Sequence, residues 1–600
     1  MTRPAVRRAL RRLRALLPRC SDYRGLRRSW PRDLAAGLTV GIVALPLALA
    51  FGVATGVGAA AGLITAVVAG VVAAVFGGSH LQVSGPTGAM TVVLVPLVAS
   101  RGPEVVYPVA VLAGLFVIVA AALRFGRLLA YIPWPLIEGF TVGIAVVIAA
   151  QQVPNALGVA QPDVDNAASA AVVAAVRFAD DPRWPVLGLL ALSLLVTAGL
   201  PRLHRSLPAS LIAVVVATFV AETAGVDAAR IGALPSSLPL PALPDLTGLA
   251  SLLGPAVVVA FLAGLESLLS AKVADGMSDA PRHDPDRELF GQGLANVASG
   301  LCGGMPATGA IARTAVNARA GAHTRVAAIV SALVLAAVVY AGSGLVSRIP
   351  LAALAGVLMV TAWRMVERHN VRAVLRSTRG DTAVFALTAV ATIALDLIAA
   401  IVLGLALAAV LALAHLAETA QAVPEPLADD GIDDAAEHAL LAAHVLTYRI
   451  DGPLFFAASA RFLAQITAVA DVRVVILRLS GVGMLDATGA RALGEVAEQL
   501  HERGITVLLK GASPDHTRLL HAVGTLAPVA ARNHVFETLA EALAHARQHV
   551  ARHRHELPES PNDEAHAEEL LEQAALLGGV GTRVGAVDAA VDVVPGGEHP

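Results

Sequence analysis

Two stretches of the sequence place small residues and a threonine where helices are expected to begin inside an apolar region, and one of them also contains a single arginine. One is Gly303–Thr314, and the other runs from Gly77-Gly78 to Met90. Each reads Gly-Gly, a spacer, and then Thr-Gly-Ala followed by an apolar residue. A helix that begins there directs unpaired N–H groups and about half a positive charge at the space before it. The chemistry that such a start supports is the binding of an anion.

The pairing of these two helix starts predicts a two-sided site for a small anion inside a membrane. Glycine and alanine let a ligand approach the backbone closely, as at other anion sites on helix N-termini. An arginine buried in a membrane is expected to be functional and paired. Two other interpretations stay open: the glycines only allow close helix packing, or the arginine reaches the cytoplasmic interface. The predicted anion-binding residues are Thr87, Gly88, Ala89, Gly309, Ala310, Ile311 and Arg313, with Phe51 as a pocket wall.

A carboxylate and a hydroxyl share one face of a third predicted helix, near residues 251–274. Glu266 and Ser270 are four residues apart and therefore neighbours on the helix surface. A carboxylate inside a membrane can bind a cation, carry a proton or form a static ion pair with Arg313. We predict that Glu266 and Ser270 couple transport to an ion. A glutamate with a serine hydroxyl fits proton transfer slightly better than a sodium cage.

The composition places these candidate residues in a membrane. Of the 600 residues, 56% are hydrophobic and only 15% are charged, and the mean hydropathy is +0.69. The apolar residues gather before about residue 416, in runs that approach the roughly 20 residues needed to cross a hydrocarbon core ~30 Å thick. We therefore expect a polytopic membrane protein with a more polar C-terminal third. The net charge of -2 does not suggest a nucleic-acid partner.

Fourteen apolar segments are expected to be membrane spans. The third and the tenth are short and begin with Gly/Pro-rich backbone, whose polar groups could not face lipid unpaired. They hold matching positions in the first seven and the second seven segments, which is typical of a midplane binding site between inverted repeats. The expected segments are 34–54, 57–77, 84–99, 105–123, 128–150, 185–200, 208–225, 251–274, 288–302, 309–320, 324–345, 350–366, 381–397 and 398–416.

Basic residues indicate which ends of the spans face the cytoplasm. Arg124 and Arg127 follow the fourth segment, and further arginines follow the sixth, tenth and twelfth. All of these ends lie on the side of the basic N-terminal arm, residues 1–33, which the positive-inside rule assigns to the cytoplasm. The even number of spans puts the C-terminal third on the same side. The arm lacks an apolar segment with a cleavage site, so we expect no signal peptide.

After the last span, apolar helices give way to short strands that alternate with amphipathic helices. We assign residues 34–418 to the transmembrane part, 419–440 to an acidic linker, 441–554 to a cytoplasmic α/β domain and 555–600 to a flexible acidic tail. The predicted strands are 445–450, 472–479 and 505–509, and the predicted helices are 487–503, 514–524 and 535–553.

Few residues of the C-terminal domain suggest chemistry of their own. Asp486 is predicted to cap the helix that follows it, and Thr488 in the same turn is a candidate regulatory position. His545, His549 and His553 share a helix face, but their basic neighbours favour a solvated face over a metal site. We predict no metal, no cofactor and no enzyme activity, because the sequence contains no nucleotide loop, metal cluster or nucleophile arrangement.

Taken together, these motifs resemble those of the sulfate permease family of inorganic anion transporters. The resemblance covers about residues 30–550, and the C-terminal part is similar to the STAS domain (sulfate transporter and anti-sigma factor antagonist). The motifs that carry the resemblance are Asp33–Gly37 with Pro46 and Phe51, Ser84–Gly88, Tyr131–Thr141 and Pro306–Asn317.

The resemblance implies seven-plus-seven inverted repeats, a core domain that moves against a gate domain, and often a homodimer. It also implies an anion between the Thr-Gly-Ala start at residues 87–89 and the Gly-Ala-Ile start at residues 309–311. Sodium-coupled bicarbonate members have Asp and Thr where this chain has Glu266 and Ser270, which favours coupling to protons here. Related antagonist domains carry a phosphorylated Ser or Thr in the turn that holds Thr488.

The function expected from these features is secondary active transport of a small inorganic anion, with sulfate as the first choice. The expected partners are a co-transported proton and the lipid bilayer of the cell membrane. Sodium–bicarbonate symport, dicarboxylate symport and anion exchange are alternatives within the class. A passive anion channel and a membrane sensor that signals through its STAS domain are alternatives outside it.

Overall fold

A computed structural model gives the fold of this chain in two compact units, residues 1–408 and 409–600, which are described here one at a time. The N-terminal arm up to residue 15, most of the expected linker, and the tail with His553 lie outside the described residues. The structure describes residues 16–23, 26–127, 132–162, 164, 166–203, 207–232, 234, 237–245, 248–278, 281–395, 397–425, 441, 444–459, 472–525 and 534–552.

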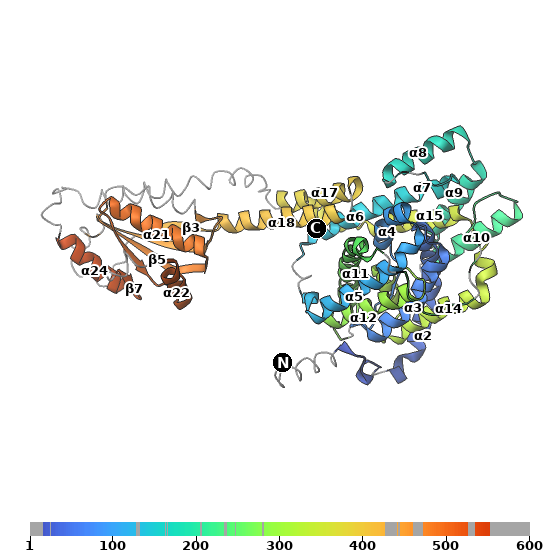
Figure 1. Ribbon diagram of the computed structural model, residues 1–600, viewed down its shortest axis with the longest axis horizontal. Coiled ribbons are helices and arrows are strands. Elements are labelled where there is room, and N and C mark those ends of the chain that lie inside the picture. Colours follow the sequence, from blue (N-terminus) through green and yellow to red (C-terminus); the bar gives the residue numbers. More distant parts are fainter. Residues whose placement is uncertain are drawn as a thin grey trace, which may run out of the picture. The chain divides into compact units, whose positions relative to one another are not determined.

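The first unit is a bundle of helices, and each expected apolar segment coincides with one of them (Figure 1). Three further helices, α7, α8 and α16, lie between the expected segments. The helices are α2 (Leu26–Ala54), α3 (Ala59–Phe76), α4 (Gly88–Arg101), α5 (Val106–Ala122), α6 (Trp134–Gln151), α7 (Val153–Leu157), α8 (Ala167–Asp180), α9 (Trp184–Leu203), α10 (Ala209–Thr223), α11 (Leu249–Met277), α12 (Pro285–Leu301), α13 (Ile311–Arg319), α14 (Val326–Val346), α15 (Leu351–Met365), α16 (Arg368–Leu375), α17 (Arg379–Ala394) and α18 (Leu397–Glu418).

Not every helix of the bundle is long enough to cross a membrane alone. Within the described residues, seven helices have the length and apolarity of a span, or eight if the bent α14 is counted as one. The third and tenth expected segments are the shortest of the set: α4 has 14 residues and α13 has nine. At 1.5 Å per residue, a nine-residue helix covers less than half of a ~30 Å hydrocarbon core. At the same rise, the 14 residues of α4 cover about 21 Å. Neither helix crosses such a core alone, and we call both half-helices.

The helices pack in two groups that match the expected core and gate domains. Helices α2–α5 pack with α11–α14, and α6–α10 pack with α15–α18. The first group contains expected spans one to four and eight to eleven. The second group contains expected spans five to seven and twelve to fourteen. Each half of the chain thus contributes equivalent helices to both groups, as an inverted repeat requires. Helices α2 and α4 of the first group contact α15 and α6 of the second.

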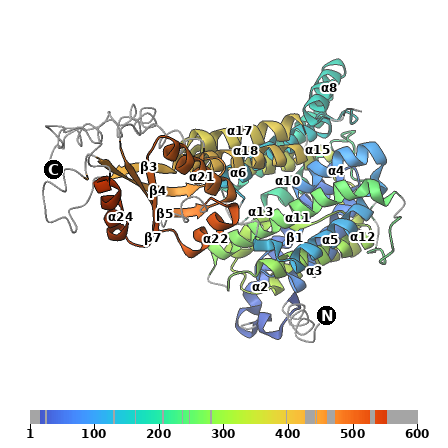
Figure 2. The ribbon, with the colours of Figure 1, turned by 60° about the vertical axis from the view of Figure 1, so that its left-hand side comes forward.

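Two short extended segments precede the half-helices and pair with each other. Strand β1 (Ser84–Gly85) is antiparallel to β2 (Thr308–Gly309), with Ser84 opposite Gly309 and Gly85 opposite Thr308. All four residues are buried. Strand β2 also packs on α11, and Figure 2 shows β1 and α13 in the interior of the bundle beside that helix. The antiparallel pair brings the starts of α4 and α13 together.

The second unit is a five-stranded sheet covered by helices, in the order β3-β4-β5-β6-β7. Its strands are β3 (Gln421–Glu425), β4 (Val445–Leu454), β5 (Val474–Leu485), β6 (Thr506–Lys510) and β7 (Val535–Phe536). Strand β3 is antiparallel to β4, and the other neighbours are parallel. Strand β3 lies inside the range 419–440, so the assignment of that part to a linker is wrong.

Alternating side chains of the central strand pack against helices on both faces of this sheet. Val475 and Leu477 of β5 lie in one apolar cluster with α21 (Ala487–Glu502) and α22 (Pro514–Val523). Val474 and Ile476 lie in a second cluster with α24 (Leu539–Arg552). A strand buried on both faces is typical of a parallel sheet with helical connections. The predicted strands 445–450, 472–479 and 505–509 and the predicted helices 487–503 and 514–524 are confirmed, with ends shifted by a few residues. The predicted helix 535–553 is confirmed from Leu539 to Arg552, but Val535 and Phe536 at its expected start form β7 instead.

Candidate functional site

The two half-helices begin without the side-chain caps that usually pair the first N–H groups of a helix. Thr87 is the N-cap of α4 and Ala310 is the N-cap of α13, and neither side chain accepts a hydrogen bond from its helix. The first intrahelical bonds are Thr91 N–H to Thr87 O (3.2 Å) and Thr314 N–H to Ala310 O (2.9 Å). The N–H groups of the first turn of each helix are therefore directed out of the helix.

The hydrogen bonds of the β-pair change which N–H groups can serve an anion. The Gly309 N–H donates to Ser267 Oγ (3.0 Å), and the Ala310 N–H donates to the Val83 carbonyl (3.0 Å). In this structure these two N–H groups hold the extended segment in place, and an anion contact at Gly309 and Ala310 stays a prediction. The first-turn donors of α13 are those from Ile311 to Arg313, two residues further along the chain than the expected Gly309–Ile311.

Arg313 lies in the interior between the two broken segments. Its side chain is only 3% exposed, and its Nη2 donates to the Pro86 carbonyl (2.7 Å). The guanidinium also occupies the space beside Gly85, where an added Cβ would lie 2.7 Å from Nη1. The alternative that Arg313 reaches the membrane interface is thus wrong. The arginine of one half-helix fixes the backbone that leads into the other.

Glu266 of α11 reaches the start of the other half-helix. Its carboxylate accepts a hydrogen bond from the Thr87 hydroxyl (2.9 Å). Among the described residues, no lysine, arginine or histidine nitrogen lies within 4.0 Å of this carboxylate. Glu266 and Arg313 therefore form no close ion pair in this structure, although their opposite charges attract each other over a longer distance. Glu266 is half-buried and adjoins the N-terminus where an anion is expected.

Ser270, the predicted companion of Glu266, takes part in a different contact. Its hydroxyl is 2.9 Å from the Thr314 hydroxyl, and Thr314 in turn accepts a bond from the Val83 N–H (3.1 Å). Ser267 lies closer to the half-helix start, because its hydroxyl accepts from Gly309 and is 3.1 Å from that of Thr308. Sequence analysis overlooked Ser267, although it lies one residue after Glu266.

Amide side chains of α12 hold the extended segment that enters β2. The Asn296 Oδ1 accepts a hydrogen bond from the Ala307 N–H (2.8 Å), and the Asn296 Nδ2 donates one to the Ala307 carbonyl (2.9 Å). Gln292 donates to the same carbonyl (2.8 Å) and accepts from the Ser84 hydroxyl (2.9 Å). These bonds replace the helical bonds that the broken backbone lacks, as required inside a membrane. In the sequence, these two residues could have been recognised as amide side chains four residues apart within one expected span.

Side chains fill the space beside both glycines of the predicted site. An added Cβ on Gly88 would lie 2.2 Å from Ile148 Cδ1 of α6 and 3.5 Å from Phe51 Cε1 of α2. Phe51 of α2 therefore lies beside the start of α4, and its role as a pocket wall stays a prediction. An added Cβ on Gly309 would lie 1.9 Å from Gln82 Nε2. The buried Gln82 amide has no hydrogen-bond partner among the described residues, and sequence analysis did not single it out.

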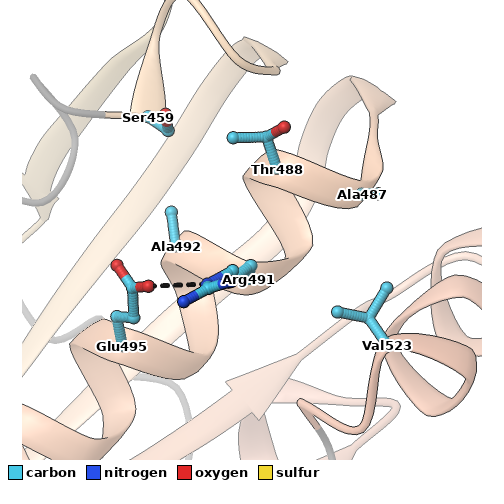
Figure 3. Close-up of a pocket in the computed structure, with 7 residues that line it drawn as sticks. All are labelled: Ser459, Ala487, Thr488, Arg491, Ala492, Glu495 and Val523. Atoms are coloured by element: carbon cyan, nitrogen blue, oxygen red, sulfur yellow. Dashed lines mark hydrogen bonds and ion pairs between the residues drawn. The ribbon is translucent and has the colours of Figure 1, made fainter.

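In the second unit, Thr488 is exposed on the first turn of α21. The predicted cap is confirmed, because the Asp486 carboxylate accepts from the Gly489 N–H (2.7 Å). Figure 3 shows Thr488 beside an open pocket of about 550 Å³, whose wall also contains Arg491 and Glu495, hydrogen-bonded to each other (2.9 Å). The threonine hydroxyl is thus accessible, and a regulatory role for it stays a prediction.

The histidines of α24 do not form the solvated face that the sequence favoured. His545 and His549 are half-buried and face His534, a buried residue at the start of β7. The neighbour that completes this cluster comes from another part of the chain, so spacing along the helix could not reveal it.

A bundle of two helix groups, with two broken helices that meet head to head inside it, defines a membrane transporter of the inverted-repeat kind. The sequence pattern of the Sulfate permease family matches residues 31–388, and that of the STAS domain matches residues 440–542. The chain belongs to the sulfate permease family.

Relatives with similar sequences are named as sulfate and bicarbonate transporters. The chain is 33% identical to the putative sulfate transporter YvdB of Bacillus subtilis over 528 residues, which cover 84% of this chain and 96% of the relative. It is 32% identical to the bicarbonate transporter BicA of Synechocystis over 563 residues, which cover 88% and 96%.

Solved structures agree with the fold. The transmembrane domain of a cyanobacterial bicarbonate transporter BicA matches 62% of this chain and 98% of its own length, with 31% identity and a TM-score of 0.58. The structure of murine Slc26a9, an anion transporter in the inward-facing state, matches 86% and 91% with a TM-score of 0.75. At 18% identity this second likeness concerns the fold alone.

Proposed function

We propose that this protein is a proton-coupled secondary transporter of sulfate or a closely similar oxyanion. The observation that carries the proposal is the Thr87–Glu266 hydrogen bond, which joins a half-helix start to an intramembrane carboxylate (2.9 Å). An anion held by the first turns of α4 and α13 would lie next to Glu266. Two negative charges in a low-dielectric site repel each other strongly. Binding of the anion therefore favours the protonated form of Glu266.

This repulsion is a coupling mechanism. The anion binds more tightly when Glu266 carries a proton, and by reciprocity the proton binds more tightly when the anion is present. The positive ends of the two half-helices and the buried Arg313 guanidinium offset the charge of the anion. Anion and proton would then cross the membrane together.

The position of the site between the two helix groups supports alternating access. Gly88 and Ala89 belong to α4 of the core group, whereas Ile148, which packs against Gly88, belongs to α6 of the gate group. A movement of the core group along the gate group would change the surroundings of the α4 start without breaking the β1–β2 pair. Rigid-body movement around a fixed site is common in inverted-repeat transporters.

A bicarbonate transporter is the second candidate, because a relative with 32% identity over 88% of this chain is named a bicarbonate transporter. Coupling to sodium is the alternative to proton coupling for such a transporter. Proton coupling is preferred because the Ser270 hydroxyl, which would be a sodium ligand beside Glu266, is 2.9 Å from the Thr314 hydroxyl instead. We further propose that the protein lies in the cell membrane with the N-terminal arm and the STAS domain in the cytoplasm, as the arginine distribution indicates.

Uptake by purified protein in proteoliposomes tests the proposal. Labelled sulfate, bicarbonate and fumarate are offered separately under an imposed pH gradient, a sodium gradient, or neither. We expect sulfate to accumulate against its own gradient when the outside is acidic, with no need for sodium. Accumulation of bicarbonate that requires sodium would replace the proposal with the second candidate. Equilibration without accumulation under every gradient would indicate a passive channel.

A further inference from the structure

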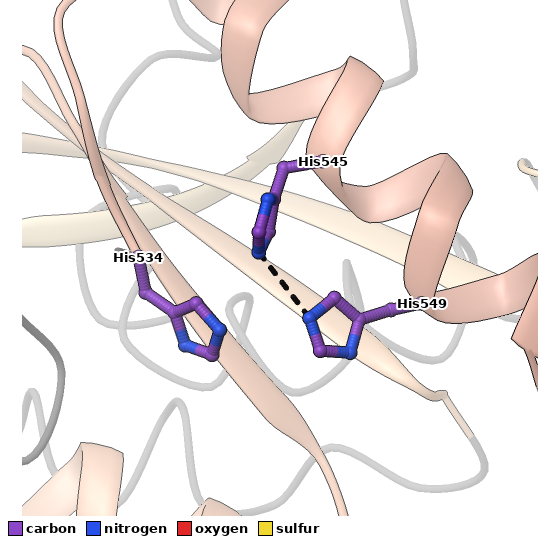
Figure 4. A group of neighbouring side chains, drawn as sticks. All are labelled: His534, His545 and His549. Atoms are coloured by element: carbon purple, nitrogen blue, oxygen red, sulfur yellow. Dashed lines mark hydrogen bonds between the residues drawn. The ribbon is translucent and has the colours of Figure 1, made fainter. Parts of the chain in front are cut away.

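Three histidines of the STAS domain converge at one edge of its sheet. His545 and His549 are four residues apart on α24, and His534 immediately precedes β7. One ring nitrogen from each lies within 4.8 Å of the other two. Figure 4 shows the three rings turned toward one another, two from the helix and one from the strand side.

The spacing of the ring nitrogens fits a common tetrahedral ion. The Nε2 atoms of His545 and His549 are 3.3 Å apart. A tetrahedral zinc ion with Zn–N distances of about 2.0–2.1 Å holds its ligand nitrogens about 3.3–3.4 Å apart. Two histidines at positions i and i+4 of a helix are a known way to supply two ligands to one metal. The separation of this helical pair therefore needs little adjustment to accept an ion.

The elements that carry the rings are fixed independently of any ion. The His534 carbonyl accepts a hydrogen bond from the Leu509 N–H of β6 (2.8 Å), and the Phe536 carbonyl accepts one from the Gly511 N–H (3.0 Å). Helix α24 is held on the sheet by Leu543, Ala546 and Val550, which belong to one buried apolar cluster. The third ligand is thus placed by the sheet and the first two by the helix, which is the kind of rigid support that a metal site requires.

We propose that His534, His545 and His549 form a binding site for a divalent transition metal, with Zn²⁺ as the first choice. Imidazole nitrogens suit zinc, copper and nickel, and they do not suit magnesium or calcium. Three protein nitrogens leave one tetrahedral position for water or another small ligand. The bound ion would join α24 to the edge of the sheet at β7.

A different explanation is that the rings only pack as an aromatic cluster. The ring centroids of His534 lie 5.2 Å from those of His545 and 5.4 Å from those of His549, with steep angles between the planes. Such contacts, together with the hydrogen bond between His545 and His549, account for ring packing and for one of the separations. They do not require that one nitrogen from each of the three rings gather within 4.8 Å.

Zinc binding by the full-length protein tests the proposal. The protein is purified in detergent without a polyhistidine tag, stripped with a chelator, and dialysed against Zn²⁺ at low micromolar concentration before elemental analysis. We expect about one Zn²⁺ per chain in the wild type, with nitrogen ligands at about 2.0–2.1 Å in X-ray absorption spectra. His534→Ala and the conservative His549→Gln should each weaken binding by at least about tenfold.

His521→Ala is the matched control, because His521 is an exposed histidine on α22 of the same domain. It should bind zinc like the wild type. Amide hydrogen exchange in α24 supplies a second readout, and we expect Zn²⁺ to slow it in the wild type and in His521→Ala but not in His549→Gln. Absence of zinc from the wild type, or equal zinc content in all four proteins, would overturn the proposal.

Discussion

At the scale of single residues, the site depends on two charged side chains with separate partners. Arg313 donates to the Pro86 carbonyl, and Glu266 accepts from the Thr87 hydroxyl. Pro86 and Thr87 are consecutive, so the two charges approach adjacent residues of the same segment. A direct ion pair would neutralise both groups and leave little positive charge for a ligand. Separate partners fit the proposed roles, in which the guanidinium attracts the anion and the carboxylate takes up the proton.

Arg313→Gln should weaken anion binding more than it harms folding. The substitution removes a charge-assisted interaction with the anion worth about 1.5–3 kcal/mol, which corresponds to roughly a tenfold to hundredfold rise in KM. The KM for sulfate exchange in proteoliposomes measures this effect. Arg319→Gln is the control, because Arg319 is exposed at the end of the same helix and donates to its own Ala315 carbonyl. An unchanged KM in Arg313→Gln would assign the arginine a structural role only.

Ser270→Ala should leave proton coupling intact, in contrast to the expectation from sequence. The hydroxyl contacts Thr314 rather than Glu266, so its removal affects the packing of α11 on α13. We expect a loss of about 1 kcal/mol in stability, together with a wild-type dependence of sulfate accumulation on the pH gradient. Thermal unfolding and gradient-driven uptake measure the two quantities. A loss of coupling with normal stability would restore Ser270 to the coupling site.

The residues of the site could be predicted only in part. Arg313 and Glu266 are conspicuous in the sequence because a charge in an apolar span is rare. Gln82 and Ser267 are not, because uncharged polar residues are frequent at helix contacts and their partners are distant in sequence. The N–H groups of Gly309 and Ala310 were assigned to the anion because sequence cannot reveal the β1–β2 pair that uses them.

At the scale of elements, the repeated Gly-Gly pair has a packing role. The Gly78 and Ser79 N–H groups donate to the Glu288 carboxylate of α12 (2.8 and 3.0 Å), and Arg325 of the α14 start donates to the Gly77 carbonyl. These bonds pair the backbone where α3 ends. The glycines permit the close approach, because α12 passes directly over them.

Gly78→Ala should destabilise the core group. An added Cβ would lie 2.1 Å from the Asp284 carbonyl and 2.8 Å from the Glu288 N–H, and backbone atoms cannot rotate away. Overpacking of this kind costs about 1–3 kcal/mol, so we expect a lower Tm and a smaller yield of monodisperse protein. Gly254→Ala in α11 is the control, since an added Cβ there meets no atom within 4 Å. Equal stability of the two variants would refute this packing role.

Among the elements, the long apolar helices were predictable and the irregular segments were not. A long, continuous apolar run identifies a helix such as α5 or α11 directly. The linker assignment failed at β3, where Gln421–Glu425 pairs with β4 as an edge strand. This segment contains Pro424 and ends at Glu425. Proline and charged residues are typical of a linker, but an edge strand also tolerates them.

At the scale of the whole molecule, the N-terminal segment is tied to the core group by one buried ion pair. Asp22 in the turn Cys20–Tyr23 accepts hydrogen bonds from both terminal nitrogens of Arg287 in α12 (3.1 and 2.6 Å). Burial alone would raise the pKa of Asp22. The hydrogen bonds from Arg287 and from the Arg19 backbone outweigh burial and lower this pKa to about 2.

Asp22→Asn should reduce stability at neutral pH but not in acid. Because the folded pKa is lower than the usual value of 3.8, the ion pair stabilises the protein fully above about pH 4 and progressively less as the pH falls toward 2. We expect a loss of about 1.5–3 kcal/mol at pH 7. Unfolding measured at several pH values checks this, with Asp181→Asn, at an exposed ion pair, as the control. A deficit that stays constant between pH 7 and 3 would contradict the assignment.

The two-group architecture was the most predictable property of the molecule. Hydropathy separates the transmembrane part from the STAS domain, and the matching positions of two interrupted segments indicate the inverted repeat. The histidine cluster was the least predictable, because His534 approaches His545 and His549 only through the parallel pairing of β6 with β7. Contacts between residues that are distant in the sequence can be predicted only when the fold is known.

The central claim is that Glu266 carries the coupled proton while the two half-helices hold the anion. Glu266→Gln keeps the size of the side chain and an acceptor for the Thr87 hydroxyl but removes the charge. In proteoliposomes with an inward gradient of about one pH unit, which can drive roughly tenfold accumulation per coupled proton, wild-type protein and the control Glu138→Gln should concentrate labelled sulfate. Glu266→Gln should still exchange sulfate for sulfate but should not concentrate it. Proton-driven accumulation at the wild-type level in Glu266→Gln would contradict the account.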